Sequence, residues 1–248
     1  MTEWIYGRNA VLEVLRAQRR KTDHLRMAAK LQPSKRLESI KQFASEQKIP
    51  IEIVDKANLN KLANGHQGVA LRVAGYPYSD LGKMLFVAKE RGEKPFLLLL
   101  DTLQDPQNLG TLLRSAEAVG VHGVILPHRH TATVTPAVVS VSSGASEHLL
   151  ISQQNLAQAI ALLKEENIWV IGLDGANEVP LIDQTKLAGS LALVVGSEAE
   201  GMRKLVRESC DLLFRLPMHG QIESLNAAVA GSVVLYLASQ GRKTSASH

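Results

Sequence analysis

Three short segments carry polar side chains whose types could do chemistry, and each segment follows an apolar run. The segments are residues 105–114, 195–202 and 216–226, and their polar candidates are Asn108, Arg114, Glu198, Ser224 and Asn226. Arg114 offers a planar guanidinium that stays protonated and suits phosphate. Glu198 stands where a phosphate site would avoid an acid, whereas a cationic ligand or a substrate hydroxyl group would tolerate one.

Each candidate also has an ordinary structural interpretation. Asn108 could cap the helix that follows it, and Arg114 could be a solvated residue paired with Glu117. The turn at Gly196 could be a simple strand-to-helix connection, and Ser224 could be the N-cap of the next helix. Taken one at a time, the segments do not decide between these interpretations and a functional site.

The elements that must position these residues alternate along the second half of the chain. Residues 95–101 form a continuous apolar run bounded by turn residues, which is typical of a parallel strand buried on both faces. Similar patterns predict strands at 123–126, 169–173 and 191–195, and helices at 109–119, 155–166 and 227–238. This alternation predicts a parallel sheet with right-handed crossovers, whose ligands bind at the carboxyl ends of the strands.

A smaller α/β unit precedes this sheet. Residue spacing predicts helices at 9–15 and 34–46, and strands at 24–27, 49–54 and 68–73. Gly75 and Pro77 then break both kinds of element. We therefore predict a small domain over residues 1–76, a linker over 77–94 and a second domain over 95–248.

Composition is that of an ordinary globular protein, and it excludes several classes. The chain has 248 residues, of which 45% are hydrophobic, and Cys210 is its single cysteine. Neither a disulfide nor a cysteine-based zinc site can therefore form within one chain. No apolar run approaches the roughly 18 residues of a membrane span, and no signal-peptide pattern begins the chain. We expect a cytoplasmic protein with no membrane partner and, because His128 and His130 lack the spacing of metal ligands, no metal.

Charge is unevenly divided along the chain. Residues 1–94 contain 18 lysines and arginines against 10 acidic residues, whereas residues 95–248 contain 10 against 14. Basic charge supplies most non-specific affinity for nucleic acids, so the first part is the candidate nucleic-acid-binding region. The alternative interpretation is a solvated surface rich in lysine. Only 4% of residues are aromatic, which leaves little for base stacking and favours recognition through backbone and shape.

The three polar segments, in this order, resemble the three motifs of the SpoU-TrmH methyltransferases, which use S-adenosyl-L-methionine to methylate ribose 2′-hydroxyls in RNA. Residues 5–11 and 66–70 also look like the small RNA-binding domain that many members carry in front. The resemblance implies an α/β fold: a parallel-sheet SPOUT domain with a C-terminal trefoil knot, preceded by a small α/β RNA-binding domain. It also implies a homodimer that acts on RNA.

The resemblance assigns roles to individual residues. The implied catalytic residues are Arg114, Asn108, Glu198, Ser224 and Asn226, and the implied cofactor-binding residues are Gly196, Leu216, Met218 and Leu225. We favour a role for Arg114 in holding the phosphate of the target nucleotide and lowering the barrier to deprotonation of its 2′-hydroxyl. A general base at Arg114 is the less favoured alternative, because arginine stays protonated in proteins.

The layout is most like the subgroup that methylates a guanosine of large-subunit (23S) ribosomal RNA. The alternatives are a tRNA ribose 2′-O-methyltransferase and a non-catalytic RNA-binding module on the same scaffold. Other nucleotide-binding enzymes are disfavoured, because the chain has no Gly-x-Gly-x-x-Gly after a strand and no Gly-Lys-Ser/Thr loop.

Overall fold

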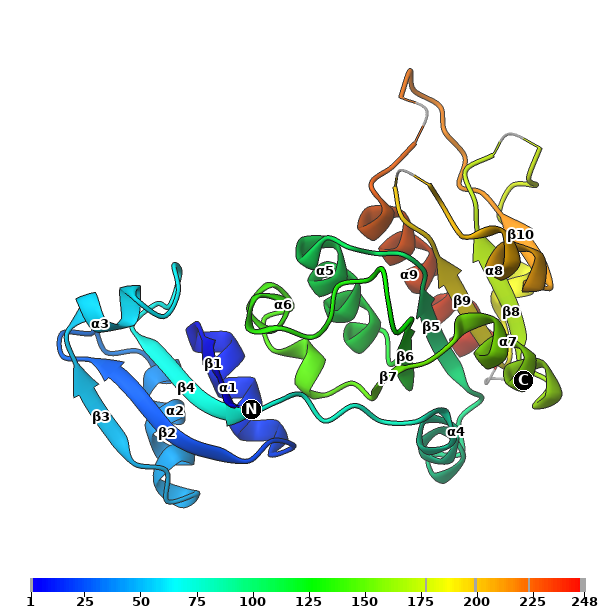
Figure 1. The fold of residues 1–248 in the computed structure, drawn as a ribbon. Helices are drawn as coiled ribbons and strands as arrows, with labels where there is room; N and C mark the ends of the chain where they lie inside the picture. Colours follow the sequence, from blue (N-terminus) through cyan, green and yellow to red (C-terminus); the bar gives the residue numbers. More distant parts are fainter. Residues whose placement is uncertain (1, 177, 199, 223, 246–248) are drawn as a thin grey trace. The chain divides into compact units, whose positions relative to one another are not determined.

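The computed structural model describes residues 2–176, 178–198, 200–222 and 224–245, and it divides into two compact units (Figure 1). Unit 1 comprises Met1–Pro77 and Val134–His148, and unit 2 comprises Tyr78–Thr133 and Leu149–His248. The chain therefore passes from one unit to the other three times. In the part of the chain that the structure describes, no helix is both long and apolar enough to span a membrane.

Unit 2 is built on a six-stranded sheet in the order β10-β8-β9-β5-β6-β7, and every neighbouring pair is parallel. Its strands are β5 (Phe96–Leu100), β6 (Gly123–Leu126), β7 (Ile151–Gln153), β8 (Trp169–Leu173), β9 (Leu191–Val195) and β10 (Leu212–Phe214). The parallel sheet predicted from the sequence is confirmed. The edge strands β7 and β10 were not predicted, because three residues are too few for a periodic signal.

Helices cover both faces of this sheet. They are α4 (Leu81–Glu90), α5 (Pro106–Ala118), α7 (Leu156–Glu165), α8 (Lys204–Ser209) and α9 (Ala227–Ser245), with a 3-10 turn η2 (Gln184–Leu187). Buried side chains of α4, α7 and α8 pack on alternate strand residues such as Leu97 and Leu99. Helices α5 and α9 pack together, and the hydroxyl groups of Ser115 and Ser232 lie 2.8 Å apart between them.

Helix α4 lies in the range 77–94 that the sequence analysis interpreted as a linker. Asp80 caps it by accepting a hydrogen bond of 2.8 Å from the N–H of Lys83. Met84 and Ala88 are fully buried, and Met84 belongs to the core of unit 2. Apolar residues at helical spacing were present here, but the helix-breaking residues just before them suggested a linker instead.

Unit 1 contains a four-stranded mixed sheet in the order β1-β4-β2-β3. Only β2 and β3 run parallel, because β4 pairs antiparallel with both β1 and β2. The elements are β1 (Thr2–Tyr6), α1 (Arg8–Ala17), β2 (Thr22–Ala28), α2 (Lys35–Glu46), β3 (Ile51–Val54), α3 (Lys56–Asn60) and β4 (Val69–Ala74). Helices α1 and α2 pack against each other, and α1 contacts the sheet through β1 and β4.

Residues 134–148 complete unit 1, although they follow β6 of unit 2 in the chain. Helix α6 (Pro136–Val141) packs on β1, and the 3-10 turn η1 (Ala145–Glu147) packs on α1. Val138 and Val139 are fully buried there. We call this segment the strap. The predicted domain ranges 1–76 and 95–248 did not foresee it, because a sequence pattern does not reveal which unit will bury an apolar helix.

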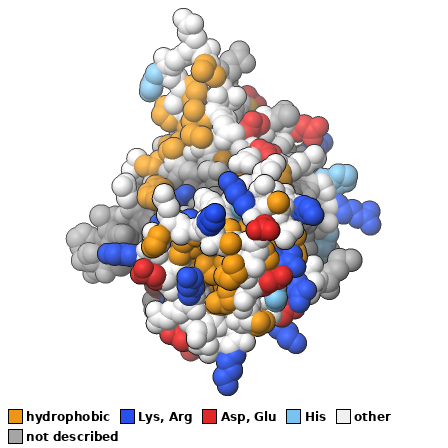
Figure 2. Space-filling model, turned by 90° about the vertical axis from the view of Figure 1, so that its left-hand side faces the viewer, with side chains coloured by type: hydrophobic (Ala, Val, Ile, Leu, Met, Phe, Trp, Pro, Cys, Tyr) orange, Lys and Arg blue, Asp and Glu red, His pale blue; other side chains and the backbone are white. Residues whose placement is uncertain are grey.

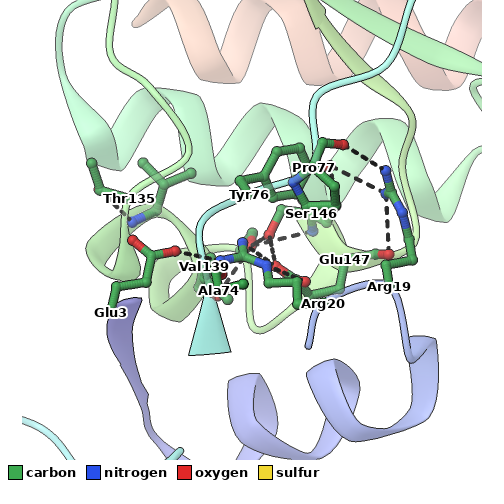
Figure 3. A network of polar contacts seen from close by, with 12 residues as sticks. Glu3, Arg19, Arg20, Ala74, Tyr76, Pro77, Thr135, Val139, Ser146 and Glu147 are labelled. Carbon is green, nitrogen blue, oxygen red and sulfur yellow. Dashed lines mark hydrogen bonds and ion pairs between the residues drawn. The ribbon is translucent and has the colours of Figure 1, made fainter. Parts of the chain in front are cut away.

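A buried ion pair holds the strap in place (Figure 3). The Nε and Nη2 groups of Arg20 donate to the two carboxylate oxygens of Glu147 at 2.8 and 2.7 Å, and Arg20 also pairs with Glu3. The hydroxyl of Tyr76 donates to the carbonyl of Ser146 at 2.8 Å. Burial raises the pKa of Glu147 and of Tyr76. Both ion-pair side chains are at most 1% exposed, so removing Arg20 would deprive the buried carboxylate of Glu147 of its two-bond partner, and removing Glu147 would leave the buried guanidinium with Glu3 as its remaining acidic partner among the described residues.

Candidate active site

A cleft of about 710 Å³ opens at the carboxyl ends of β8, β9 and β10 and reaches the start of α9. The second and third polar segments form much of its lining, together with residues 173–176 after β8. All four residues expected to bind a cofactor line this cleft: Gly196, Leu216, Met218 and Leu225. The location agrees with the rule that parallel sheets bind ligands beyond the carboxyl ends of their strands.

Gly196 is required by a close approach of two backbone segments in the cleft wall. A Cβ atom at position 196 would lie 2.2 Å from the carbonyl carbon of Gly201. Ser197 and Gly201 maintain this approach through two reciprocal backbone hydrogen bonds of 3.0 Å. Any side chain at position 196 would push these segments apart, so the glycine sets the shape of the wall.

Asn108, Glu198 and Asn226, one from each polar segment, form a hydrogen-bonded cluster beside the cleft. Asn108 Nδ2 donates to Glu198 Oε1 at 2.9 Å, and Asn226 Nδ2 donates to Asn108 Oδ1 at 3.0 Å. Asn226 Nδ2 also donates to Glu198 Oε1, and the N–H of Ala227 donates to the same oxygen at 3.3 Å. Since Glu198 Oε2 has no hydrogen bond to the described residues, it can accept one from a ligand.

The helix ends explain how these side chains are held. Asp105 caps α5 by accepting from the N–H of Gln107 at 2.9 Å. Asn108 therefore lies in the first turn of α5, and its interpretation as the cap is wrong. Asn226, rather than Ser224, caps α9, because its Oδ1 accepts from two N–H groups of the first turn at 3.0 and 3.1 Å. Capping leaves the amide of Asn226 oriented toward the cluster.

Ser224 lines the cleft with an exposed side chain. Arg114, by contrast, is exposed on α5 and is not among the residues that line the cleft. Within one chain, the structure thus brings four of the five expected catalytic residues to the cleft or to the cluster beside it. Arg114 is the exception.

Sequence reasoning missed a second groove, of about 570 Å³, which Asn108 and Glu198 also border. Arg203 lines it and is held by Asp101, which is fully buried and accepts from Arg203 N and Nε at 2.8 Å each. The sequence contained one sign of this ion pair, because an acidic residue, Asp101, ends the continuous apolar run 95–101. A carboxylate placed there needs a partner once the strand is buried.

The charges that line the cleft favour a cationic or hydroxyl-bearing ligand. Its acidic residues are Asp174, Glu198 and Glu200, and Arg215 is its one basic residue among those described. The described residues contain no group of three histidine, cysteine or acidic side chains that could hold a metal. Burial raises the pKa of the Cys210 thiol to about 12, so this thiol stays protonated at neutral pH and is no nucleophile.

In unit 1, the two segments that resembled an RNA-binding domain lie together. The backbone N–H of Arg8 donates to Oε1 of Gln67 at 3.0 Å, and Nε of Arg8 donates to the carbonyl of Gln67 at 3.0 Å. Both residues line a groove of about 1140 Å³. The resemblance thus rests on segments that are distant in sequence and joined in the structure.

Two family models match the chain, one over its first part and one over its second part. Residues 95–236 match the model of the SpoU rRNA Methylase family, and residues 4–79 match the model for RNA 2′-O ribose methyltransferase substrate binding. A protein of Bacillus subtilis (strain 168), assigned to the TrmH family of tRNA/rRNA methyltransferases, is 40% identical over 238 residues, which is 94% of each chain. A Staphylococcus aureus (strain MSSA476) protein of the same assignment is 43% identical over 202 residues, 81% of each chain.

Solved structures share the fold. The SpoU methyltransferase AviRb from Streptomyces viridochromogenes, in complex with AdoMet, superposes with a TM-score of 0.79 at 23% identity, over 98% of this chain and 91% of that one. An AdoMet-bound rRNA methyltransferase from Sinorhizobium meliloti gives 0.75 at 21% identity, over 96% and 87%. The extent of the family match and the identity to the Bacillus protein decide the assignment. The chain belongs to the SpoU-TrmH family of RNA methyltransferases.

Proposed function

We propose that the protein transfers a methyl group from S-adenosyl-L-methionine to a ribose 2′-hydroxyl of RNA. The observation that carries this proposal is the cluster of Asn108, Glu198 and Asn226 beside a cleft with an acidic lining. A module that only binds RNA would not need a cleft at the carboxyl ends of the strands with a carboxylate held in a fixed orientation beside it.

The cleft fits the cofactor by its chemistry. Leu216, Met218 and Leu225 offer apolar surface for the adenosine and methionine parts, and the backbone at Gly196 allows close approach. Acidic residues in the lining favour the positive charge of a sulfonium. When bound, S-adenosyl-L-methionine supplies an electrophilic methyl group, which is transferred without a metal.

The residues beside the cleft position the acceptor. A sugar hydroxyl is a poor nucleophile at neutral pH, so its oxygen must be held in line with the methyl group and polarised. Glu198 Oε2 is available to accept a hydrogen bond from the 2′-hydroxyl, while Asn108 and Asn226 fix the carboxylate through its other oxygen. Ser224 lies on the same cleft and supplies a further hydrogen bond near the ribose.

We assign Arg114 to the phosphate of the target nucleotide and place it in the cleft of a second copy of the chain. Two observations support this. Arg114 does not line the cleft of its own chain. Helix α9 also exposes apolar residues at helical spacing, since Val229, Val233 and Tyr236 are 47%, 41% and 52% exposed. A homodimer through this face would bury them.

We also retain the C-terminal trefoil knot as a proposal from the family.

The target we propose is a guanosine of 23S ribosomal RNA, with a tRNA ribose as the alternative. Unit 1, which matches the substrate-binding family, selects the RNA. Mapping 2′-O-methyl groups in ribosomal and transfer RNA from cells that lack the protein tests this directly. Loss of one ribosomal guanosine methylation supports the proposal, and loss of a tRNA site alone supports the alternative.

Binding of the cofactor tests the enzyme assignment itself. Calorimetric titration with S-adenosyl-L-methionine in the presence of a chelator should show binding. The Gly196→Val variant should lose it, because the side chain would separate the segments of the cleft wall. An unmodified protein that binds no cofactor at millimolar concentration would overturn the enzymatic proposal and leave the RNA-binding module.

A further inference from the structure

Unit 1 contains a groove with an excess of positive charge. It lies between the start of α1, the end of β2, helix α3 and residues 64–68, and its charged lining residues are Arg8, Lys30, Arg36, Asp55 and Lys56. Four of these five charges are basic. The side chains of Lys30, Arg36 and Lys56 form no hydrogen bond or ion pair with the described residues, so their charges are available to an anionic ligand. Figure 2 looks at the molecule from the side on which unit 1 is drawn, and shows Lys and Arg side chains (blue) spread over it.

His66 fixes the orientation of one amide in this groove. The N–H of Gly68 donates to His66 Nδ1 at 2.9 Å, so the imidazole proton must reside on Nε2. Nε2 therefore donates to Asn60 Oδ1 at 2.8 Å. This bond fixes which atom of the Asn60 amide is the oxygen, so the Nδ2 group faces away from His66 and offers its two N–H donors to a ligand.

The orientation of the Gln67 side-chain amide is fixed in a similar way. Its Oε1 accepts from the backbone N–H of Arg8 at 3.0 Å, so its Nε2 group is left to donate. Gly68, which follows it, has φ of 85°, and a Cβ atom there would lie 2.1 Å from Cδ2 of Leu31. The loop that carries Gln67 is thus held closely against the end of β2. The groove presents fixed amide donors as well as cations.

These observations decide which ligand fits. Phosphate oxygens match the cations, and the carbonyl oxygens and ring nitrogens of a base match the amide donors. In an A-form RNA duplex the major groove is too deep and narrow for side chains to read, so base edges become accessible where nucleotides are unpaired. At about 1140 Å³ the groove also exceeds a site for one small molecule, and has room for a nucleotide with its neighbouring phosphates.

We propose that this groove binds an unpaired nucleotide of the RNA substrate. Lys30, Arg36 and Lys56 hold its flanking phosphates, and the Nδ2 group of Asn60 and the Nε2 group of Gln67 donate to acceptor atoms of its base. This proposal rests on the proposed function for its choice of RNA, and it names a second recognition site away from the methylated ribose. The protein then selects substrates that have a loop or bulge in addition to the target nucleotide.

The test measures binding of the full-length protein to two RNA probes by fluorescence anisotropy. One probe is a hairpin with a single-stranded loop, and the other is a blunt duplex with the stem sequence of the hairpin. The unmodified protein should prefer the hairpin. Replacing Lys56 or Arg36 with glutamine should weaken binding to both probes and lower the salt slope by about one unit, whereas Lys41→Gln, on an exposed position of α2 outside the groove, should not.

A matched pair of variants isolates the amide donors. Asn60→Asp and Asn58→Asp each add one negative charge to the short helix α3, but Asn58 does not line the groove. Asn60→Asp should reduce affinity for the hairpin about tenfold more than Asn58→Asp does. Asn60→Ala, which removes the donors without adding charge, should also abolish the preference for the hairpin.

Equal losses for the two aspartate variants, or equal affinity of the unmodified protein for both probes, would overturn the proposal. Calorimetry with S-adenosyl-L-methionine accompanies each variant. Cofactor binding should be unchanged by all groove variants, and its absence in the unmodified protein would count against the proposed function and not against the groove.

Discussion

The cleft of unit 2 and the groove of unit 1 carry opposite charge. Among the described residues, the cleft of unit 2 is lined by three acidic residues and one arginine, whereas the groove of unit 1 is lined by four basic residues and one aspartate. The first suits a cofactor with a positively charged sulfonium, and the second suits the phosphates of RNA. The linings of the cleft and the groove thus repeat the charge division seen in the sequence. A solvated lysine-rich surface would not require this arrangement.

The largest effect is expected for the strap, because it tests whether the two units fold independently. Residues 95–248 were expected to form a domain, but the strap within them is buried in unit 1. A chain that begins at Tyr78, the first residue of unit 2, should therefore lose at least about 5 kcal/mol of unfolding free energy, because the buried valines of the strap lose their cover while α4 is kept. Urea unfolding of both chains measures this, and equal midpoints would show that unit 2 folds alone.

A single substitution within the strap should have a smaller effect of the same kind. Among the described residues, Glu147→Ala leaves the buried guanidinium of Arg20 with only Glu3 as an acidic partner, and it should destabilise the protein by about 3–5 kcal/mol. Asp23→Ala, which breaks the exposed pair with Arg72 away from the strap, is the control and should cost less than about 1 kcal/mol. The double variant Arg20→Met/Glu147→Leu should recover much of the loss, because both charges are removed. No recovery would mean that the ion pair is not the cause.

Substitution of Arg114 should separate binding of the cofactor from the reaction with RNA. Arg114→Ala should lower methyl transfer by about 10²–10³-fold, while affinity for S-adenosyl-L-methionine changes little, because the guanidinium is assigned to the nucleotide. The measurements are methyl transfer to RNA from cells lacking the protein and calorimetric titration of the cofactor. Arg114→Lys should rescue little, since an ammonium cannot reproduce the planar fork. A lysine variant with most of the activity would contradict the phosphate role.

Sequence patterns predicted the parts of the fold that repeat over many residues. The four longest strands of unit 2 and the helices α5, α7 and α9 were found close to their predicted ranges. The strap, the short edge strands and the location of α4 were not predicted, because they depend on which surface covers an apolar element. The same limit applied at the site. The residues Asn108, Glu198 and Asn226 were named in advance, but the cap at Asp105 and the Asp101–Arg203 pair became evident only from the structure.

The smallest expected effect concerns pH, and it should appear in both units. His66 in unit 1 and His122 in unit 2 each accept a hydrogen bond at Nδ1 from a backbone N–H, at 2.9 and 3.0 Å. Both imidazoles must therefore be neutral, and burial lowers the pKa of each. A pKa that is lower in the folded state means that protons bind preferentially to the unfolded chain. Stability is then complete above the ordinary histidine pKa of about 6.5 and is lost as the pH falls through and below that value.

His122 offers the cleaner test, because it lies outside the groove of unit 1 and the second nitrogen of its imidazole pairs with Glu93, which can be substituted separately. Unfolding free energy should fall for this group as the pH decreases through and below about 6.5. His122→Gln should be less stable at neutral pH and should lose less on acidification, whereas His128→Gln, at an exposed position, should keep the full dependence. Since Glu93 opposes the effect of burial, Glu93→Gln should enlarge the acid-induced loss. A loss that Glu93→Gln reduces would instead assign the acid sensitivity to that carboxylate.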